Sequence, residues 1–120
     1  MEKPGKLSSV AIKVDLWVHT TGNILVEDSH YRKQLDGKSV KEHGWLYTCR
    51  ADYLFVIDPV GNKMYQFNWK LLKAFVVEGD ADVHRRDWDN KTDESTRSVA
   101  YTIKLEAIRK KQLLLKEWDI

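Results

Sequence analysis

Hydrophobic and polar residues alternate in the first third of the chain, as half-buried β-strands require. Residues 10–19 alternate with a period of two, and a short apolar run follows at 24–26. Between the two runs the chain reads Thr-Thr-Gly-Asn, which is turn chemistry because glycine and asparagine readily adopt positive φ. The pattern therefore predicts a β-hairpin that joins residues 10–19 to residues 24–26.

The middle of the chain combines one polar stretch with the longest β-rich run. Residues 28–42 are polar without clear periodicity and predict an irregular excursion. Residues 45–58 are apolar on both faces apart from Arg50, Asp52 and the terminal Asp58, which is typical of a central strand. A turn at 59–62 and a further strand at 63–68 follow.

The last part of the chain predicts two helices and one more strand. Asn68 can cap a helix over residues 69–77, and residues 105–118 have the apolar spacing of a closing helix. Residues 80–98 predict a long polar surface loop, and residues 99–103 a short strand. The order predicts one α+β domain over residues 1–120, with a mixed or antiparallel four- to five-stranded sheet packed by two helices.

Composition restricts the class of protein. Of the 120 residues 42% are hydrophobic and 32% charged, and the net charge is only +2, so any basic surface must be local. The single cysteine excludes an internal disulfide and favours a reducing compartment. Without an apolar run of spanning length or a signal-peptide pattern, we expect a cytoplasmic protein with no membrane partner.

Carboxylates on predicted strands are the main candidates for chemistry. A metal-dependent nuclease needs two carboxylates on neighbouring strands to share a divalent ion, and usually a lysine two positions beyond the second. Asp15 and Glu27 face one another across the predicted hairpin, and they are the candidate catalytic and metal-binding pair. Ser29 occupies the lysine position, although Lys13 or Lys33 could supply the ammonium group instead.

A second register of the same site is also open. Asp52 would then be the first acid, and Gln66 and Asn68 would stand where an acidic residue and a lysine are needed. Alternatively Asp52 is paired with Arg50 or with a lysine, because an unpaired buried carboxylate is costly. The histidines lack the spacing of a zinc site, and no cofactor is expected unless the nuclease is active and binds magnesium.

Several of these segments together carry a family resemblance. The Asp15 strand, the glycine turn, the Glu27 strand, Gly-Trp-Leu-Tyr at 44–47 and Ala-Asp-Tyr-Leu at 51–54 resemble small phage-encoded proteins of the PD-(D/E)xK nuclease-like superfamily. The resemblance covers roughly residues 13–75 and implies a restriction-endonuclease-like core. It also implies that Asp15 and Glu27 are the two acids. Because Ser29 replaces the lysine and the usual leading helix is missing, the resemblance implies a degenerate active site.

Two basic clusters could contact the phosphates of DNA or RNA. One comprises Arg32, Lys33, Lys38 and Lys41, and the other comprises Arg109, Lys110 and Lys111. The leading hypothesis is a non-catalytic phage or prophage accessory protein that binds nucleic acid or a host or phage protein. The alternatives are a divalent-metal endonuclease that uses Asp15 and Glu27, and a host-defence inhibitor that acts by protein contact through the loop at 80–98. For a phage protein, the compartment would be the host cytoplasm.

Overall fold

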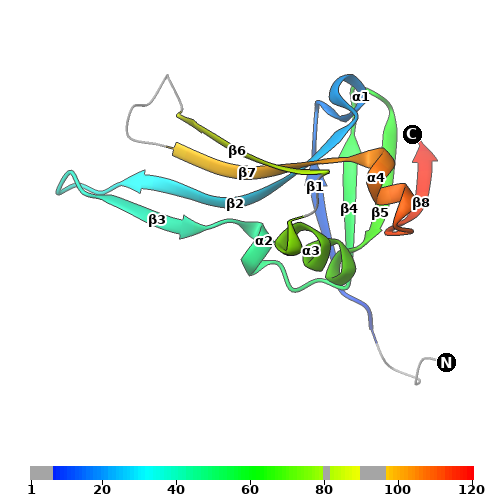
Figure 1. The fold of residues 1–120 in the computed structure, drawn as a ribbon, viewed down its shortest axis with the longest axis horizontal. Helices are drawn as coiled ribbons and strands as arrows, with labels where there is room; N and C mark the ends of the chain where they lie inside the picture. Colours follow the sequence, from blue (N-terminus) through cyan, green and yellow to red (C-terminus); the bar gives the residue numbers. More distant parts are fainter. Residues whose placement is uncertain (1–6, 80–81, 90–96) are drawn as a thin grey trace.

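Residues 7–79, 82–89 and 97–120 are described in a computed structural model of the chain. Within these residues the fold is α+β, with two four-stranded sheets and four short helices (Figure 1). The strands are β1 Val10–Val14, β2 Asn23–Lys33, β3 Ser39–His43, β4 Tyr53–Asp58, β5 Lys63–Asn68, β6 Val83–Asp89, β7 Arg97–Lys104 and β8 Leu114–Asp119. The helices are α1 Val18–Thr21, α2 Trp45–Thr48, α3 Trp69–Glu78 and α4 Leu105–Lys110.

The first sheet has the strand order β1-β4-β5-β8. Strand β1 runs parallel to β4, whereas β4, β5 and β8 pair antiparallel. Strand β4 alternates between buried and half-buried residues, and Leu54 and Val56 lie on its buried face. A central strand with one fully buried face anchors this sheet in the core.

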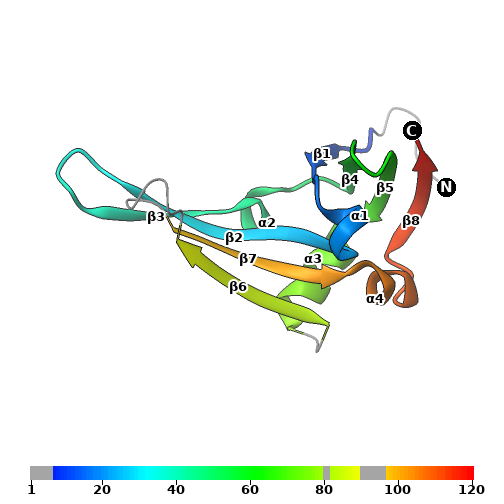
Figure 2. The ribbon, with the colours of Figure 1, turned by 90° about the horizontal axis from the view of Figure 1, so that it is seen from above.

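The second sheet has the strand order β3-β2-β7-β6 and is antiparallel throughout. One end packs against the rest of the protein through Ile24, Val26 and Ile103, which are fully buried. Its other end projects outward, and the β2–β3 hairpin reaches furthest (Figures 1 and 2). The radius of gyration of 15.9 Å exceeds the roughly 13.6 Å expected for a compact domain of this length because of this projection.

Helix α3 contributes much of the core where the two sheets meet. Trp69, Leu72 and Val76 on its inner face are almost completely buried. The Asn68 side chain accepts a hydrogen bond from the backbone N–H of Leu71, which caps the first turn of the helix. The predicted strand at 63–68 and the predicted helix from residue 69 are therefore confirmed. In the described ranges, no helix combines the length and the apolar character needed to cross a bilayer.

The predicted hairpin between residues 10–19 and 24–26 is wrong. Strand β1 pairs with β4 in the first sheet, whereas β2 pairs with β3 and β7 in the second. The intervening segment forms α1, which ends at Gly22 in the left-handed conformation, with φ of 69°. A helical turn carries the chain from one sheet to the other, which a tight hairpin turn could not do.

Three further predictions need correction because polar or leucine-rich patterns do not fix the type of element. Residues 28–42 form most of β2 and β3, and their pattern is polar because solvent reaches both faces of the projecting end. Residues 45–48 are helical, so the strand predicted from residue 45 begins only at Tyr53. The helix predicted over residues 105–118 ends at Lys110, and β8 completes the first sheet instead.

The predicted surface loop at 80–98 is also only partly a loop. Residues 83–89 form β6, which pairs with β7 along its whole length. Residues 80–81 and 90–96 lie outside the described residues. The polar character of this segment agrees with the position of β6 at the edge of the second sheet.

A buried carboxylate connects the two sheets. Asp58 at the end of β4 is 0% exposed, and it accepts hydrogen bonds from the backbone N–H of His19 at 2.9 Å and from His19 Nδ1 at 3.0 Å. It also accepts from the N–H groups of Val60 at 3.1 Å and Gly61 at 2.9 Å. Burial raises the pKa of Asp58, but the hydrogen bonds from Gly61 and His19 outweigh burial and leave the pKa below its ordinary value.

We predict that Asp58→Asn lowers the free energy of unfolding by about 2 kcal/mol at neutral pH, because the charged acceptor is lost and an amide N–H then faces donors. Since the folded pKa is depressed, the carboxylate stabilises the fold above the unfolded pKa of about 3.9, and this contribution disappears as pH falls through the folded value. Urea titrations at pH 7 and at pH 3 measure both effects, and the difference between wild type and variant should shrink at pH 3.

Glu106→Gln is the matched control, because Glu106 is a largely exposed carboxylate whose partner is Lys110, four residues later in the chain. An exposed pair of this kind contributes little, so this variant should unfold within about 0.5 kcal/mol of the wild type. Equal losses in both variants would contradict the role assigned to Asp58.

Candidate functional site

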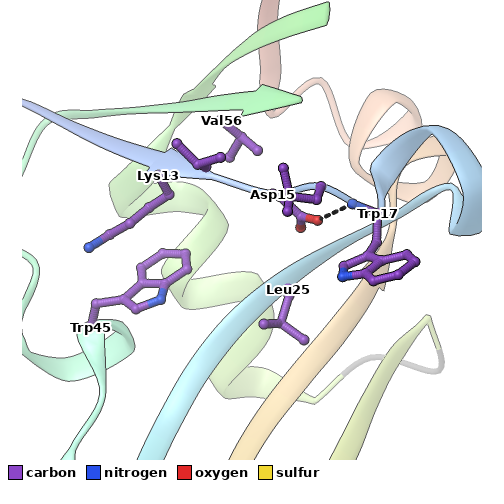
Figure 3. Close-up of a pocket in the computed structure, with 8 residues that line it drawn as sticks. Lys13, Asp15, Trp17, Leu25, Trp45 and Val56 are labelled. Carbon is purple, nitrogen blue, oxygen red and sulfur yellow. Dashed lines mark hydrogen bonds between the residues drawn. The ribbon is translucent and has the colours of Figure 1, made fainter. Parts of the chain in front are cut away.

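A pocket of about 290 Å³ lies where the first sheet, the second sheet and α2 come together. Apolar and aromatic side chains form most of its wall, and one lysine and one aspartate bring opposite charges to it (Figure 3). The lining residues are Lys13, Val14, Asp15, Leu16, Trp17, Leu25, Trp45 and Val56. A concave site with few polar groups among aromatic rings is the usual form of a small-ligand site.

The orientation of β1 puts its polar residues into this pocket. Val10 and Ile12 are 54% and 61% exposed, so this side of the strand faces outward, and Val14, which is 65% exposed, meets the pocket only at the end of the strand. Lys13 and Asp15 have the opposite parity and line the pocket. In the register of the sheet Lys13 pairs with Val56, whose side chain is buried, which fixes the inward direction.

Lys13 is held by an aromatic ring rather than by an acid. Its Nζ lies 5.2 Å from the ring centre of Trp45, which is cation–π geometry. Among the ion pairs of the described residues, none involves Lys13. Its positive charge is therefore not neutralised by a neighbouring carboxylate.

Gly44 positions Trp45 at the start of α2. Its N–H donates to the carbonyl oxygen of Asp28 at 2.7 Å, and an added Cβ would lie 2.4 Å from the carbonyl oxygen of Glu27. Only glycine fits so close to the backbone of β2. The Trp45 ring then packs 5.2 Å from the ring of Trp69, which anchors it to the core.

Asp15 occupies the rim of the pocket immediately after β1. Its N–H donates to the carbonyl oxygen of Ile57 at 2.9 Å, and its Oδ1 accepts the N–H of Trp17 at 2.9 Å. Figure 3 shows the carboxylate beside Trp17, with Leu25 below it. No ion pair within the described ranges includes Asp15, so its charge also has no cationic partner there.

Glu27 lies on β2, in the other sheet. It has the same parity as Leu25, so its side chain lies one repeat of the strand further along the same face. Its Oε1 lies 3.2 Å from His30 Nδ1, and His30 Nε2 lies 3.2 Å from Glu42 Oε2. The structure thus places Asp15 and Glu27 on strands of separate sheets, and Glu27 has a histidine partner.

A β-bulge in β2 changes the direction in which the side chain at position 29 points. Glu27 pairs with Ala100 and Ser29 with Val99, so the residues at 27 and 29 face opposite sides of the sheet. Ser29 is 1% exposed and points into the protein. In a regular strand residues two apart share a face, but here positions 27 and 29 do not, so even a lysine at 29 would not lie beside Glu27.

The residues present do not assemble a metal centre in the part of the chain that the structure describes. No group of three or more histidine, cysteine, aspartate or glutamate side chains is placed to hold an ion there. Asp15 Oδ1 holds the Trp17 N–H, and Glu27 holds His30. We therefore derive no metal-dependent step from this geometry.

Asp52 has a structural role. Its Oδ2 accepts the N–H of Ser9 at 3.0 Å, and Lys70 Nζ lies 3.3 Å from Oδ1. The hydrogen bond from the Ser9 backbone, followed by the contact with Lys70, holds the pKa of Asp52 below its ordinary value. Of the two partners predicted for Asp52, Arg50 or a lysine, the structure shows a lysine, although the Asp52 side chain is 37% exposed and not buried as predicted. Of the two neutral residues in the second register, Asn68 serves as the cap of α3.

Three of the six cations that the structure describes in the two basic clusters have acidic partners. Arg109 lies 2.6 Å from Glu117, Lys110 lies 3.5 Å from Glu106, and Arg32 lies 2.8 Å from Glu42. Exposed pairs of this kind reduce the local positive potential. No ion pair of the described residues involves the remaining members Lys38, Lys41 and Lys111, whereas the side chain of Lys33 lies outside the described structure.

Sequence reasoning missed Trp17 and Leu25 as site residues and treated Lys13 only as a substitute lysine. A signal was present, because Lys13 and Asp15 share strand parity and Trp17 continues that parity. The contribution of Leu25 could not be found in this way, since it depends on how the second sheet crosses β1.

Comparison of the chain with protein-family models, with curated proteins and with solved structures finds no match.

We predict that Gly44→Ala lowers the free energy of unfolding by about 1–3 kcal/mol, because the methyl group would overlap the backbone of β2. The backbone at Gly44, with φ of −77°, suits any residue, so the loss would come from overlap alone. Chemical denaturation measures the loss, and near-UV circular dichroism should report a changed Trp45–Trp69 pair. Gly79→Ala is the control for overlap. Its Cβ would meet nothing within 4 Å, so the variant should lose only the roughly 1 kcal/mol that alanine costs in the left-handed region, at φ of 74°, and should leave that spectrum unchanged.

Proposed function

We propose that this protein binds nucleic acid without cleaving it, and that the pocket around Lys13 takes one unpaired nucleotide. The observation that carries the proposal is the combination of an unneutralised Lys13 with the rings of Trp17 and Trp45 in one open pocket. Aromatic rings stack on bases of any sequence, and a lysine beside them contacts the phosphate chain.

The exposure of the aromatic residues supports this use of the pocket. Trp17 is 67% exposed, which is unusual for the largest apolar side chain and leaves a ring face free for a ligand. Leu25 on the facing strand is 41% exposed. An apolar surface that stays open to water in the unbound protein gains from being covered by a base.

The proposal also includes the resemblance of the sequence to nuclease-like phage proteins. A phage or prophage accessory protein with a restriction-endonuclease-like core and a degenerate site would keep its affinity for nucleic acid after losing catalysis. Glu27 does not line the pocket with Asp15 and is held by His30, and Ser29 is buried, which supports a binding role over a catalytic one. A host or phage protein as the partner, or action as a host-defence inhibitor, is the competing reading.

A divalent-metal endonuclease is the second candidate function. It is favoured by the placement of Lys13 and Asp15 in one pocket, since only the position of the ammonium group matters for catalysis. Cleavage of plasmid or single-stranded DNA in Mg²⁺ or Mn²⁺, abolished by Asp15→Ala or Glu27→Ala, would establish this function and overturn the non-catalytic one. Calorimetry with Mn²⁺ that detects no binding, together with no cleavage, would exclude it.

We predict that Lys13→Met weakens binding to a fluorescent single-stranded oligonucleotide and lowers the magnitude of the salt slope of the affinity by about 0.7. Each phosphate that the protein neutralises on a single strand adds about 0.7 to the magnitude of the salt slope, because counterions are released, and the variant makes one phosphate contact fewer. Fluorescence anisotropy across a salt series measures both the affinity and the slope.

Lys116→Met is the matched control. Lys116 also lies over a tryptophan, 4.9 Å from the ring centre of Trp118, but on β8 and away from the pocket. The same loss in both variants would mean that only the net charge matters. Affinity near zero for the wild type at every salt concentration would favour a protein partner.

A further inference from the structure

We infer that Asp15 reads the base held in the pocket and favours bases that carry an amino group. This inference rests on the proposed function and adds a specificity to it. Its starting point is that the pocket wall carries two opposite charges, Lys13 and Asp15, neither of which has an ion-pair partner among the described residues. A complementary ligand presents an anion to one and hydrogen-bond donors to the other.

The hydrogen bonds of Asp15 leave acceptor capacity for a ligand. An ionised carboxylate only accepts, and its two oxygens offer about four lone-pair sites. The Trp17 N–H occupies one site on Oδ1 and fixes the orientation of the group. Within the described structure, no hydrogen bond or ion pair is recorded to Oδ2, so this oxygen can accept a donor from a bound base.

The edges of the bases differ in the donors that they offer to a carboxylate. Cytosine, adenine and guanine each present an exocyclic amino group, and aspartate and glutamate accept the N4 amino group of cytosine in protein–DNA complexes. Uracil and thymine present two carbonyl oxygens around a single N–H, and these oxygens repel a carboxylate. Asp15 therefore favours an amino-bearing base and disfavours uracil and thymine.

The dimensions and surroundings of the pocket limit the ligand to one unpaired base. A volume of about 290 Å³ lies at the lower end of the range for small-ligand sites. A base enters a pocket of this kind only after it leaves the helical stack, so the ligand is an unpaired base. Trp17 is the ring that offers the base a free face, because the Trp45 ring already contacts Lys13 Nζ and the ring of Trp69.

The test compares oligodeoxycytidine with oligodeoxyuridine of equal length, because these two strands share ring size and backbone and differ at the amino edge. Anisotropy titrations at neutral pH use the wild-type protein and Asp15→Asn, which keeps the shape and the acceptor for Trp17. We expect the wild type to bind the cytidine strand about tenfold more tightly, and the variant to bind both strands within about twofold of each other.

A second measurement needs no variant. An oligonucleotide of N4,N4-dimethylcytidine has the same ring without amino hydrogens, and the wild type should bind it as weakly as the uridine strand. Equal binding of cytidine and uridine strands by the wild type, or a preference that persists in Asp15→Asn, overturns the role of Asp15 and leaves nucleic-acid binding intact. No binding of either strand overturns the proposed function and this inference together.

Discussion

The arrangement of the two sheets depends on one buried carboxylate. Asp58 ends the central strand of the first sheet, and its four hydrogen bonds fasten the β4–β5 turn to His19 in the segment that enters the second sheet. Gly61 must be glycine there, because an added Cβ would lie 2.6 Å from Asp58 Oδ2. A charged group without access to water tolerates little rearrangement, since each lost hydrogen bond leaves a desolvated oxygen. The position of α1, which leads the chain from β1 to β2, is therefore fixed by electrostatics as well as by apolar packing.

The pocket results from the way the two sheets diverge after α1. Strand β1 stays in the first sheet and β2 begins the second, so the inward residues of β1 face the outer side of β2 where the sheets diverge. Two close backbone contacts at Gly44 then bring α2 against β2 and close one wall with Trp45. Diverging sheets leave space that side chains cannot fill completely, and apolar side chains, two tryptophans among them, line most of it. The site is thus built from secondary-structure geometry, with few residues dedicated to it.

The parts of the fold that sequence predicts correctly are those with strong local signals. Strand β5 lies between a turn and the cap residue Asn68, and the spacing of α3 matches its buried face. The failures occur where partner choice is not local. The alternation at 10–19 identifies a strand, but nothing in it shows that the partner is β4 rather than β2. The leucines at 113–115 suit a helix or a strand, and the unpaired edge of β5 decides between them. For the site, the sequence indicates charged and aromatic residues at 13, 15 and 17. It does not indicate that Leu25 of β2 and Trp45 of α2 lie beside them, because this depends on how the elements pack.

The bulge at Glu27 explains why a motif read along one strand is a poor guide to this site. In a regular strand, residues two apart share a face, and an acid followed two residues later by a lysine would act together. One extra residue after Glu27 turns Ser29 inward, and a buried position excludes lysine because an unpaired ammonium there would be too costly. The cation of the site comes instead from Lys13 near the end of β1, and Asp15 follows directly after that strand. Lys13 and Asp15 are two residues apart and line the same pocket, together with Trp17 and Trp45. Residues 27 and 29 of β2 are also two apart, but the bulge puts them on opposite faces. The physical requirement is a pair of charges on one face, and a sequence motif predicts it only where the strand is regular.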